Sequence, residues 1–465
     1  MSDHGSGSIL PFLSELEHFL HEAQSKRSVH ITASQLIWAF VIVVVIFFIF
    51  SPTQSLNNFN LVFFLSPIWL PAILLRSAIG RFVQTKRAEF LAKQEYVLLE
   101  IRMPRDTSKT PRAMEAFFSN MHIGSGESTW YRMYIQGAMR PWWSLEIVSL
   151  GGRIHFYIWT RAGFRRLIES YLYAQYPDVE IIEAEDYSRL LNPSDHEHDM
   201  WGCEYRLSQP DPVPIKTYVD YDMKPGDKPE ETVDPLAQIL ELMGSIGPGE
   251  QLWLQFIIRQ NKGEKFVGQM TKDGKPYTFK DQATELIAQL RDSTVKKSSY
   301  VDPVSGKTIE TSGFPNPTKG QNERIAAMER KVAKQNFDVG IRCIYSGTKE
   351  AFNGIMITSQ LSLFKPFNSE AGEGNSLGVQ GVFGGAFNDF PWEDPGGHHR
   401  EHLKHEIVDL YRRRIYYAAP YIGNWNILST EELASLYHVP SSAITTPNLP
   451  RIQSTTSGAP ANLPS

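Results

Sequence analysis

The stretch that decides the fold is Trp143-Ser-Leu-Glu-Ile-Val-Ser-Leu-Gly-Gly-Arg-Ile-His-Phe-Tyr-Ile158. Apolar residues alternate with other residues on both sides of its Gly-Gly pair, and this alternation is typical of β-strands. Adjacent glycines supply the positive φ angles that a tight turn between antiparallel strands requires. The stretch therefore predicts a β-hairpin.

The segments on either side extend this hairpin to a longer order of elements. Upstream, Tyr96 to Met103 is predicted as a strand and Pro111 to His122 as a helix. Downstream, helical spacing over Phe164 to Leu172 precedes a strand at Val179 to Ile182. The order is β, α, β, β, α, β, which is that of a ferredoxin-like unit, expected over residues 76–190.

The same order recurs over residues 191–428. The expected strands and helices are Trp201 to Ser208, Asp234 to Ser245, Gln251 to Ile258, Phe337 to Tyr345 and Lys349 to Phe364. An insertion at residues 261–335 separates the two middle strands. The fold class is therefore predicted as α+β, with two tandem ferredoxin-like units, the second carrying a helical insertion.

The insertion is the most basic part of the chain. It is predicted to hold helices at Asp281 to Arg291 and Asn322 to Lys334, and residues 262–334 contain 14 Lys and Arg against 9 Asp and Glu. One interpretation is a contact with nucleic acid or an acidic partner. The other is two solvated helices with paired charges, favoured because no aromatic residues are interleaved with the lysines. The candidate contact residues are Lys296, Lys297, Arg330, Lys331 and Lys334.

A helix is expected at Ser429 to Pro440, within a C-terminal region at residues 429–465. It starts with the capping-box pattern of Ser429 and Glu432 and is stopped by Pro440. Its apolar face consists of Leu433, Leu436 and Tyr437. This face could dock a partner, with the tail at 441–465 laid along it, or it could pack on its own domain.

The N-terminal region contains the longest apolar runs. Leu36 to Phe50 carries no charge, and Phe59 to Leu75 is apolar but broken by Pro67 and Pro71. These runs predict a transmembrane hairpin at residues 31–75, preceded by an amphipathic helix within residues 1–30. Cations flank the hairpin on both sides, so both termini are expected in the cytoplasm. A buried hairpin of a globular domain is the alternative.

Composition excludes little beyond this. The chain has 465 residues and a formal net charge of -5, so no long polyanion-binding tail is indicated. Its two cysteines, Cys203 and Cys343, lie in apolar strand-like runs. We expect them to be reduced and packed as small apolar side chains, without a disulfide.

No pattern of residues predicts catalysis, a cofactor or a metal. Ser305-Gly-Lys-Thr308 resembles part of a phosphate loop, but Val301 stands where such a loop needs glycine. The histidines at 398, 402 and 405 share a helix face, and Asp195-His-Glu-His198 forms a second cluster. Neither comes with a cysteine pair or an HExxH motif, so solvated polar residues are favoured over a metal site.

Several stretches together resemble a known family. They are Leu150-Gly-Gly-Arg-Ile-His-Phe-Tyr157, Tyr173-Ala-Gln-Tyr-Pro-Asp-Val-Glu180, Asp234-Pro-Leu236, Gly247-Pro-Gly-Glu250 and Leu428-Ser-Thr-Glu-Glu-Leu-Ala-Ser-Leu-Tyr-His438. These stretches resemble the region in front of the motor domain in membrane-anchored bacterial type IV secretion and conjugation ATPases. In that family a RecA-like motor follows, and its nucleotide-binding residues have no counterpart among these 465 residues.

The resemblance implies a membrane-anchored, non-catalytic docking component of a type IV secretion or conjugation-like apparatus. Its expected location is the bacterial inner membrane as a multi-pass protein. The expected partners are that membrane, a separate motor ATPase and further copies of the chain in an oligomer. The alternative function is a membrane-tethered nucleic-acid-binding protein that binds DNA through the basic insertion.

Overall fold

A computed structural model describes most of the chain, namely residues 42, 52–104, 109–193, 197–223, 233–301, 308–369, 374–383, 396, 398–440 and 451–452. The chain divides into two compact units. Unit 1 consists of Met1–Glu95, Ser125–Arg140 and Ile415–Gly423, and unit 2 of Tyr96–Gly124, Pro141–Arg414 and Asn424–Ser465.

The first half of unit 2 is built around the predicted hairpin. Its elements in chain order are β1 (Tyr96–Pro104), α4 (Pro111–Met121), β2 (Trp143–Leu150), β3 (Arg153–Arg161), α5 (Arg165–Gln175) and β4 (Glu180–Glu183). The strands pair in the order β4-β1-β3-β2, with every pair antiparallel. At the hairpin turn Gly151 and Gly152 have φ angles of 57° and 88°. The predicted hairpin is therefore confirmed.

The second half repeats this arrangement. Its elements are β5 (His198–Leu207), α6 (Leu236–Gly244), β6 (Glu250–Gln260), β9 (Asn336–Thr348), α9 (Ile355–Leu361) and β10 (Leu377–Phe383). The strands pair antiparallel in the order β10-β5-β9-β6, which corresponds position by position to the order in the first half. Both halves therefore have the β-α-β-β-α-β order with the same strand arrangement.

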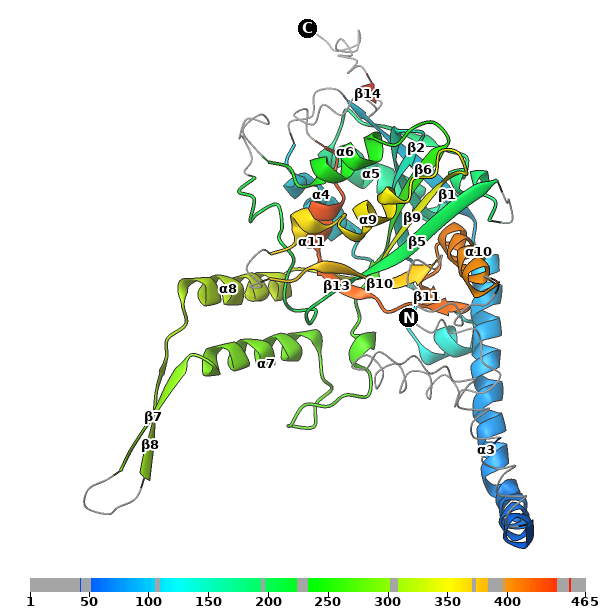
Figure 1. The fold of residues 1–465 in the computed structure, drawn as a ribbon, viewed down its shortest axis with the longest axis vertical. Coiled ribbons are helices and arrows are strands. Elements are labelled where there is room, and N and C mark those ends of the chain that lie inside the picture. The colour runs from blue at the N-terminus through cyan, green and yellow to red at the C-terminus, as the bar shows by residue number, and fades with distance from the viewer. Residues whose placement is uncertain are drawn as a thin grey trace, which may run out of the picture. The chain divides into compact units, whose positions relative to one another are not determined.

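The two halves share one sheet. Strand β2 pairs antiparallel with β6, from Trp143 opposite Ile258 to Leu150 opposite Gln251. Two C-terminal strands join the same ten-stranded sheet: β13 (Asn426–Ser429) pairs with β9, and β14 (Arg451–Ile452) runs parallel to β1. The halves are thus a continuous layer (Figure 1), which the sequence could not predict because no single strand specifies its lateral neighbour.

Helices cover both faces of this sheet. Buried residues of α4, α5 and α6 pack on one face, together with those of α11 (Thr430–Leu436), in one apolar core. The opposite face is covered by α10 (His398–Arg413), where Ile407 lies against Gly202 and the Tyr411 ring lies 5.2 Å from the Trp253 ring. Because helices cover both faces of the sheet, the polar residues of β2 are also shielded from solvent.

The insertion between β6 and β9 forms a projecting arm (Figure 1), which we call the arm. It contains α7 (Phe279–Asp292), β7 (Val295–Val301), β8 (Thr308–Pro315) and α8 (Lys319–Ala333). Its two predicted helices are confirmed. The stretch between them contains the hairpin β7–β8, which the sequence did not predict.

Unit 1 contains α3 (Pro52–Ala92), the π-helical turn η1 (Tyr131–Ile135) and the two-stranded pair β11 (Tyr417–Ala418) and β12 (Tyr421–Ile422). The turn after η1 approaches α3 closely. A Cβ atom at Gly137, whose φ is 67°, would lie 2.2 Å from the backbone of Lys86. Glycine is required there because any side chain would collide with α3.

The predicted transmembrane hairpin at residues 31–75 is wrong, and so is the multi-pass inner-membrane location. Within the described part of the chain, no helix combines the length and the apolar character that a membrane crossing requires. The second predicted span, Phe59 to Leu75, lies within the 41-residue α3, which contains Asn57 and Asn58 before the span, Asn60 inside it and cations after it. Apart from Ile42, the first span lies outside the described residues, as does the helix expected within 1–30.

Candidate functional site

The helix α11 starts with a complete capping box. The Ser429 side chain accepts a hydrogen bond from the N–H of Glu432, and the Glu432 carboxylate accepts hydrogen bonds from the N–H and the hydroxyl of Ser429 at 2.8 and 3.0 Å. Such reciprocal bonds satisfy N–H groups that the first turn of a helix leaves without partners. The predicted start of this helix is confirmed.

The Glu432 carboxylate also holds the arm to the rest of unit 2, which carries the sheet and which we call the body. Lys331 Nζ lies 3.0 Å from Glu432 Oε1, and the Ile215 N–H donates to that oxygen at 3.0 Å. The Lys331 and Glu432 side chains are each only 1% exposed. A buried charge of this kind is stable only when it is paired and hydrogen-bonded. The buried Glu432 carboxylate therefore requires Lys331 as its counter-ion, and this pair holds the last turn of α8, the base of the arm, against α11.

Further ion pairs surround the base of the arm. Glu431, which is buried, lies 3.2 Å from Arg330 and 2.7 Å from Lys334. Lys334 also contacts Glu115 at 2.6 Å, and Arg330 contacts Asp220 at 3.1 Å. The last turns of α8 thus direct their cations toward carboxylates of the body, which places opposite charges together at the junction.

Beside this junction lies an open cleft of about 490 Å³. One face of α4 forms a wall, and the opposite wall includes Tyr218, Asp222 and Met223. The hydroxyl of Tyr218 donates to Glu115 at 2.6 Å, and the hydroxyl of Ser119, also in the wall, donates to a backbone oxygen of its own helix. The lining offers cations, carboxylates and apolar surface, but no hydroxyl nucleophile beside a histidine base. The cations, carboxylates and apolar side chains of this lining are groups that can bind a ligand.

A buried pair joins α11 to the start of α6. His438 Nε2 lies 3.0 Å from Asp234 Oδ2, and His438 Nδ1 lies 2.8 Å from the carbonyl oxygen of Ala434. Burial by itself would raise the pKa of the Asp234 carboxyl. The charge of His438 and hydrogen bonds from its ring and from the Leu236 N–H instead hold that pKa below its usual range. The pair fixes the end of the α11 segment on the second half of the sheet.

The three residues predicted to dock a partner lie in the protein's own core. Leu433, Leu436 and Tyr437 are fully or almost fully buried. The Tyr437 hydroxyl donates to the carbonyl oxygen of Tyr157, and its ring packs against Phe156. The alternative interpretation of this apolar face therefore describes the structure, and these side chains present no surface to another chain. The tail at 441–465 lies outside the described residues except for β14.

The five candidate basic contacts have two different outcomes. Arg330, Lys331 and Lys334 are the cations that pair with carboxylates at the base of the arm. They do not form an exposed basic surface, because each is turned toward an acidic side chain of the body. The side chains of Lys296 and Lys297, in β7, are outside the part that the structure describes.

Four of the five stretches that carried the resemblance are joined by hydrogen bonds. The Gly151 N–H donates to the carbonyl oxygen of Glu250 at 2.9 Å, joining the β2–β3 turn to the turn before β6. The bonds from Tyr437 to Tyr157 and from His438 to Asp234 join the C-terminal stretch to two others. These residues form turns, caps and core contacts, so their spacing is explained by folding.

Sequence reasoning missed a buried polar network on the α10 face of the sheet. Glu146, in β2, is fully buried and accepts hydrogen bonds from Arg414 at 3.0 and 3.2 Å and from the Tyr187 hydroxyl at 2.7 Å. Arg414 has a φ of 49° and also binds Asp186 at 3.0 Å. Polar residues at alternate positions of β2 are typical of a strand with one face in solvent. The only available signal was the apolar face of α10, which does not identify the strands it covers.

No metal site is apparent among the described side chains. They contain no group of three or more His, Cys, Asp or Glu residues arranged to hold an ion. Of the predicted clusters, the side chain of His398 lies outside the described residues, as do Asp195 and His196. The phosphate-loop lookalike at 305–308 is described only at Thr308.

Comparison with known proteins adds no identification. The chain matches no protein-family model, and no curated protein is similar enough to it to count as a match.

Proposed function

We propose that this protein is a non-catalytic docking component of a type IV secretion or conjugation-like apparatus, and that its arm contacts a motor ATPase. The resemblance of the sequence to the platform of such ATPases supports the class of apparatus. The α11 segment, which precedes the motor in the resembled family, is here part of the core. Another surface must therefore make the contact.

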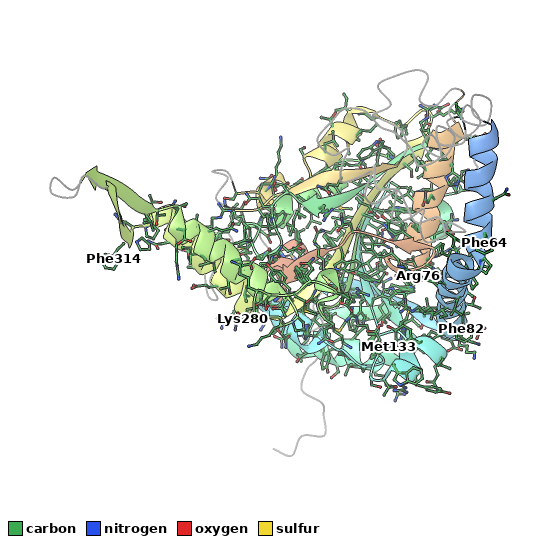
Figure 2. All side chains as sticks on the ribbon, turned by 90° about the horizontal axis from the view of Figure 1, so that it is seen from below. Phe64, Arg76, Phe82, Met133, Lys280 and Phe314 are labelled. Atoms are coloured by element: carbon green, nitrogen blue, oxygen red, sulfur yellow. The ribbon has the colours of Figure 1, made fainter. Side chains whose placement is uncertain are left out.

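The observation that carries this proposal is an exposed aromatic side chain on the arm, where β8 leads into α8. Phe314, the second-last residue of β8, is 95% exposed, and Figure 2 shows it on the hairpin side of the arm's helices, away from Lys280. Aromatic side chains are enriched among residues that dominate binding energy at interfaces. An apolar ring held in water on a projecting element is stabilised when a partner covers it.

The packing of the arm also holds the Phe314 side chain in a defined place. Leu286, Ile287 and Leu290 of α7 pack on Ile325 and Met328 of α8. Both helices begin with complete capping boxes, and the last turn of α8 joins the body through the ion pairs described above. Rigid presentation lowers the entropy lost on binding.

No specific observation favours the alternative of nucleic-acid binding. Its described candidate cations, Arg330, Lys331 and Lys334, are engaged by carboxylates at the base of the arm. Their pairing removes the charge that would attract phosphate groups.

The test compares two exposed aromatic residues. Tagged full-length protein carrying Phe314→Ser should capture at least about tenfold less ATPase activity from its own cells than the parent protein does. Tyr173→Ser, which removes a ring that is 41% exposed on α5, is the matched control and should capture as much as the parent. Mass spectrometry should identify the captured ATPase.

Equal capture by the Phe314 variant, or ATP hydrolysis by the pure protein alone, would contradict this function.

A further inference from the structure

The two cysteines of the chain face each other across neighbouring strands. Cys203 in β5 and Cys343 in β9 are direct partners in the antiparallel register. Both are fully buried free thiols in the same apolar core, so both side chains point to the face of the sheet that packs on α4, α5, α6 and α11. They lie 140 positions apart in the sequence, and only the pairing of β5 with β9 brings them together.

This placement is compatible with a disulfide bond. Residues directly opposite each other in an antiparallel pair have Cα atoms about 4.5 to 5.5 Å apart. Disulfides span Cα separations of about 4.4 to 6.8 Å, so the backbone does not have to move far. Opposite Cβ atoms lie about 4.5 to 5.5 Å apart, which is wider than most disulfides prefer. The bond would therefore be strained, and strained disulfides are the more easily reduced ones.

We propose that Cys203 and Cys343 form an oxidation site at which hydrogen peroxide closes a reversible intramolecular disulfide between β5 and β9. One thiolate attacks peroxide, the O–O bond breaks, and a sulfenic acid and hydroxide form. The second thiol then attacks the sulfenic sulfur, an S–S bond forms and water leaves. Overall, two thiols and one peroxide give one disulfide and two waters. This inference does not rest on the proposed docking function.

Burial selects the oxidant and slows the reaction. Burial raises the pKa of the Cys343 thiol to about 12 and raises that of Cys203 well above its usual range. The reactive thiolate is therefore scarce. Peroxide is close to water in size, whereas a bulky disulfide such as oxidised glutathione would have to separate β5 from β9 to reach either sulfur. The site should respond to peroxide faster than to bulky disulfides.

The experiment measures thiols and mass on the full-length protein. Reduced protein is treated with hydrogen peroxide, unfolded, and alkylated with a maleimide. The expected result is loss of both free thiols together, a mass lower by two hydrogens, a monomer on a non-reducing gel, and full recovery of both thiols after dithiothreitol. Addition of oxygen to one sulfur without loss of the other thiol would overturn the proposal. So would two unreacted thiols after exposed methionines have been oxidised.

A one-residue shift provides the control. The double variant Cys343→Ala with Ile344→Cys keeps two thiols in the chain but moves one to the opposite face of β9. It should not form the intramolecular bond at the peroxide concentration that oxidises the parent. Equal disulfide formation in this variant would show that the opposed register is not what directs the reaction. The single variant Cys203→Ala should yield a dimedone-trapped sulfenic acid and no disulfide.

Discussion

Lys331 and Glu432 form a 3.0 Å ion pair in which each side chain is only 1% exposed, although 101 positions separate them in the sequence. The pair connects the last turn of α8 to the first turn of α11. Glu432 also caps its own helix and accepts the Ile215 N–H. The pair therefore joins the arm to the element that fills the core between the two halves of the sheet.

Removing one member of this pair should be strongly destabilising. Lys331→Met leaves the Glu432 carboxylate buried without its cation, and such losses cost about 3 to 5 kcal/mol. Urea unfolding of the full-length protein measures this. The control is Lys319→Met, whose partner Glu323 lies 3.7 Å away in an exposed pair, and which should change stability by less than about 0.5 kcal/mol. Similar losses in both variants would contradict the importance of burial at Lys331.

The core position of α11 leads to a second prediction. Leu433→Ala removes a fully buried side chain and should lower the free energy of unfolding by about 2 to 5 kcal/mol. Tyr437→Phe removes only the hydrogen bond to Tyr157 and should cost about 0.5 to 1.5 kcal/mol. Urea unfolding measures both losses. If Leu433 served only to dock a partner, its replacement would leave the stability of the isolated protein unchanged.

The β-hairpin and the start of α11 could be predicted because their signals are local. Two glycines between alternating strands specify a turn, and Ser429 with Glu432 specifies a helix start within four residues. Both signals depend on side chains that meet within one turn of the chain. The order of strands in the first half follows from such local elements combined with short connections, whereas in the second half the arm separates β6 from β9.

Features that depend on distant residues could not be predicted in this way. Glu146 occupies an alternate position in β2 that would face water if α10 did not cover it. The periodicity of a strand does not show which helix lies over it. For the same reason Leu433 could not be assigned to a core or a docking surface, and the cations of α8 could not be assigned to their carboxylates. Each assignment requires contacts between residues that lie far apart in the sequence.

Acid should weaken the network around Arg414. Burial alone would raise the pKa of Asp186, but hydrogen bonds and the charge of Arg414 hold that pKa below its usual value of 3.8. Because the folded-state pKa is lower than the unfolded one, Asp186 stabilises the fold above about pH 4 and loses this contribution as the pH falls further. Asp186→Asn should be less stable than the parent at pH 7, and the difference should shrink toward pH 2.5. Urea unfolding across this range tests the sign, and a constant difference would contradict it.

The approach of η1 to α3 gives a prediction confined to unit 1. Gly137→Ala places a Cβ atom 2.2 Å from the backbone of Lys86, at a φ of 67° that alanine adopts poorly. A rigid helix backbone cannot yield as a flexible side chain would, so η1 should detach more often. The local opening free energy should fall by more than about 1 kcal/mol, and amide exchange in residues 129–138 should be at least about fivefold faster. Gly163→Ala, which has no atom within 4 Å of its new Cβ, is the control and should leave exchange in this segment unchanged. Unaltered exchange in the Gly137 variant would mean that the turn does not depend on close approach to α3.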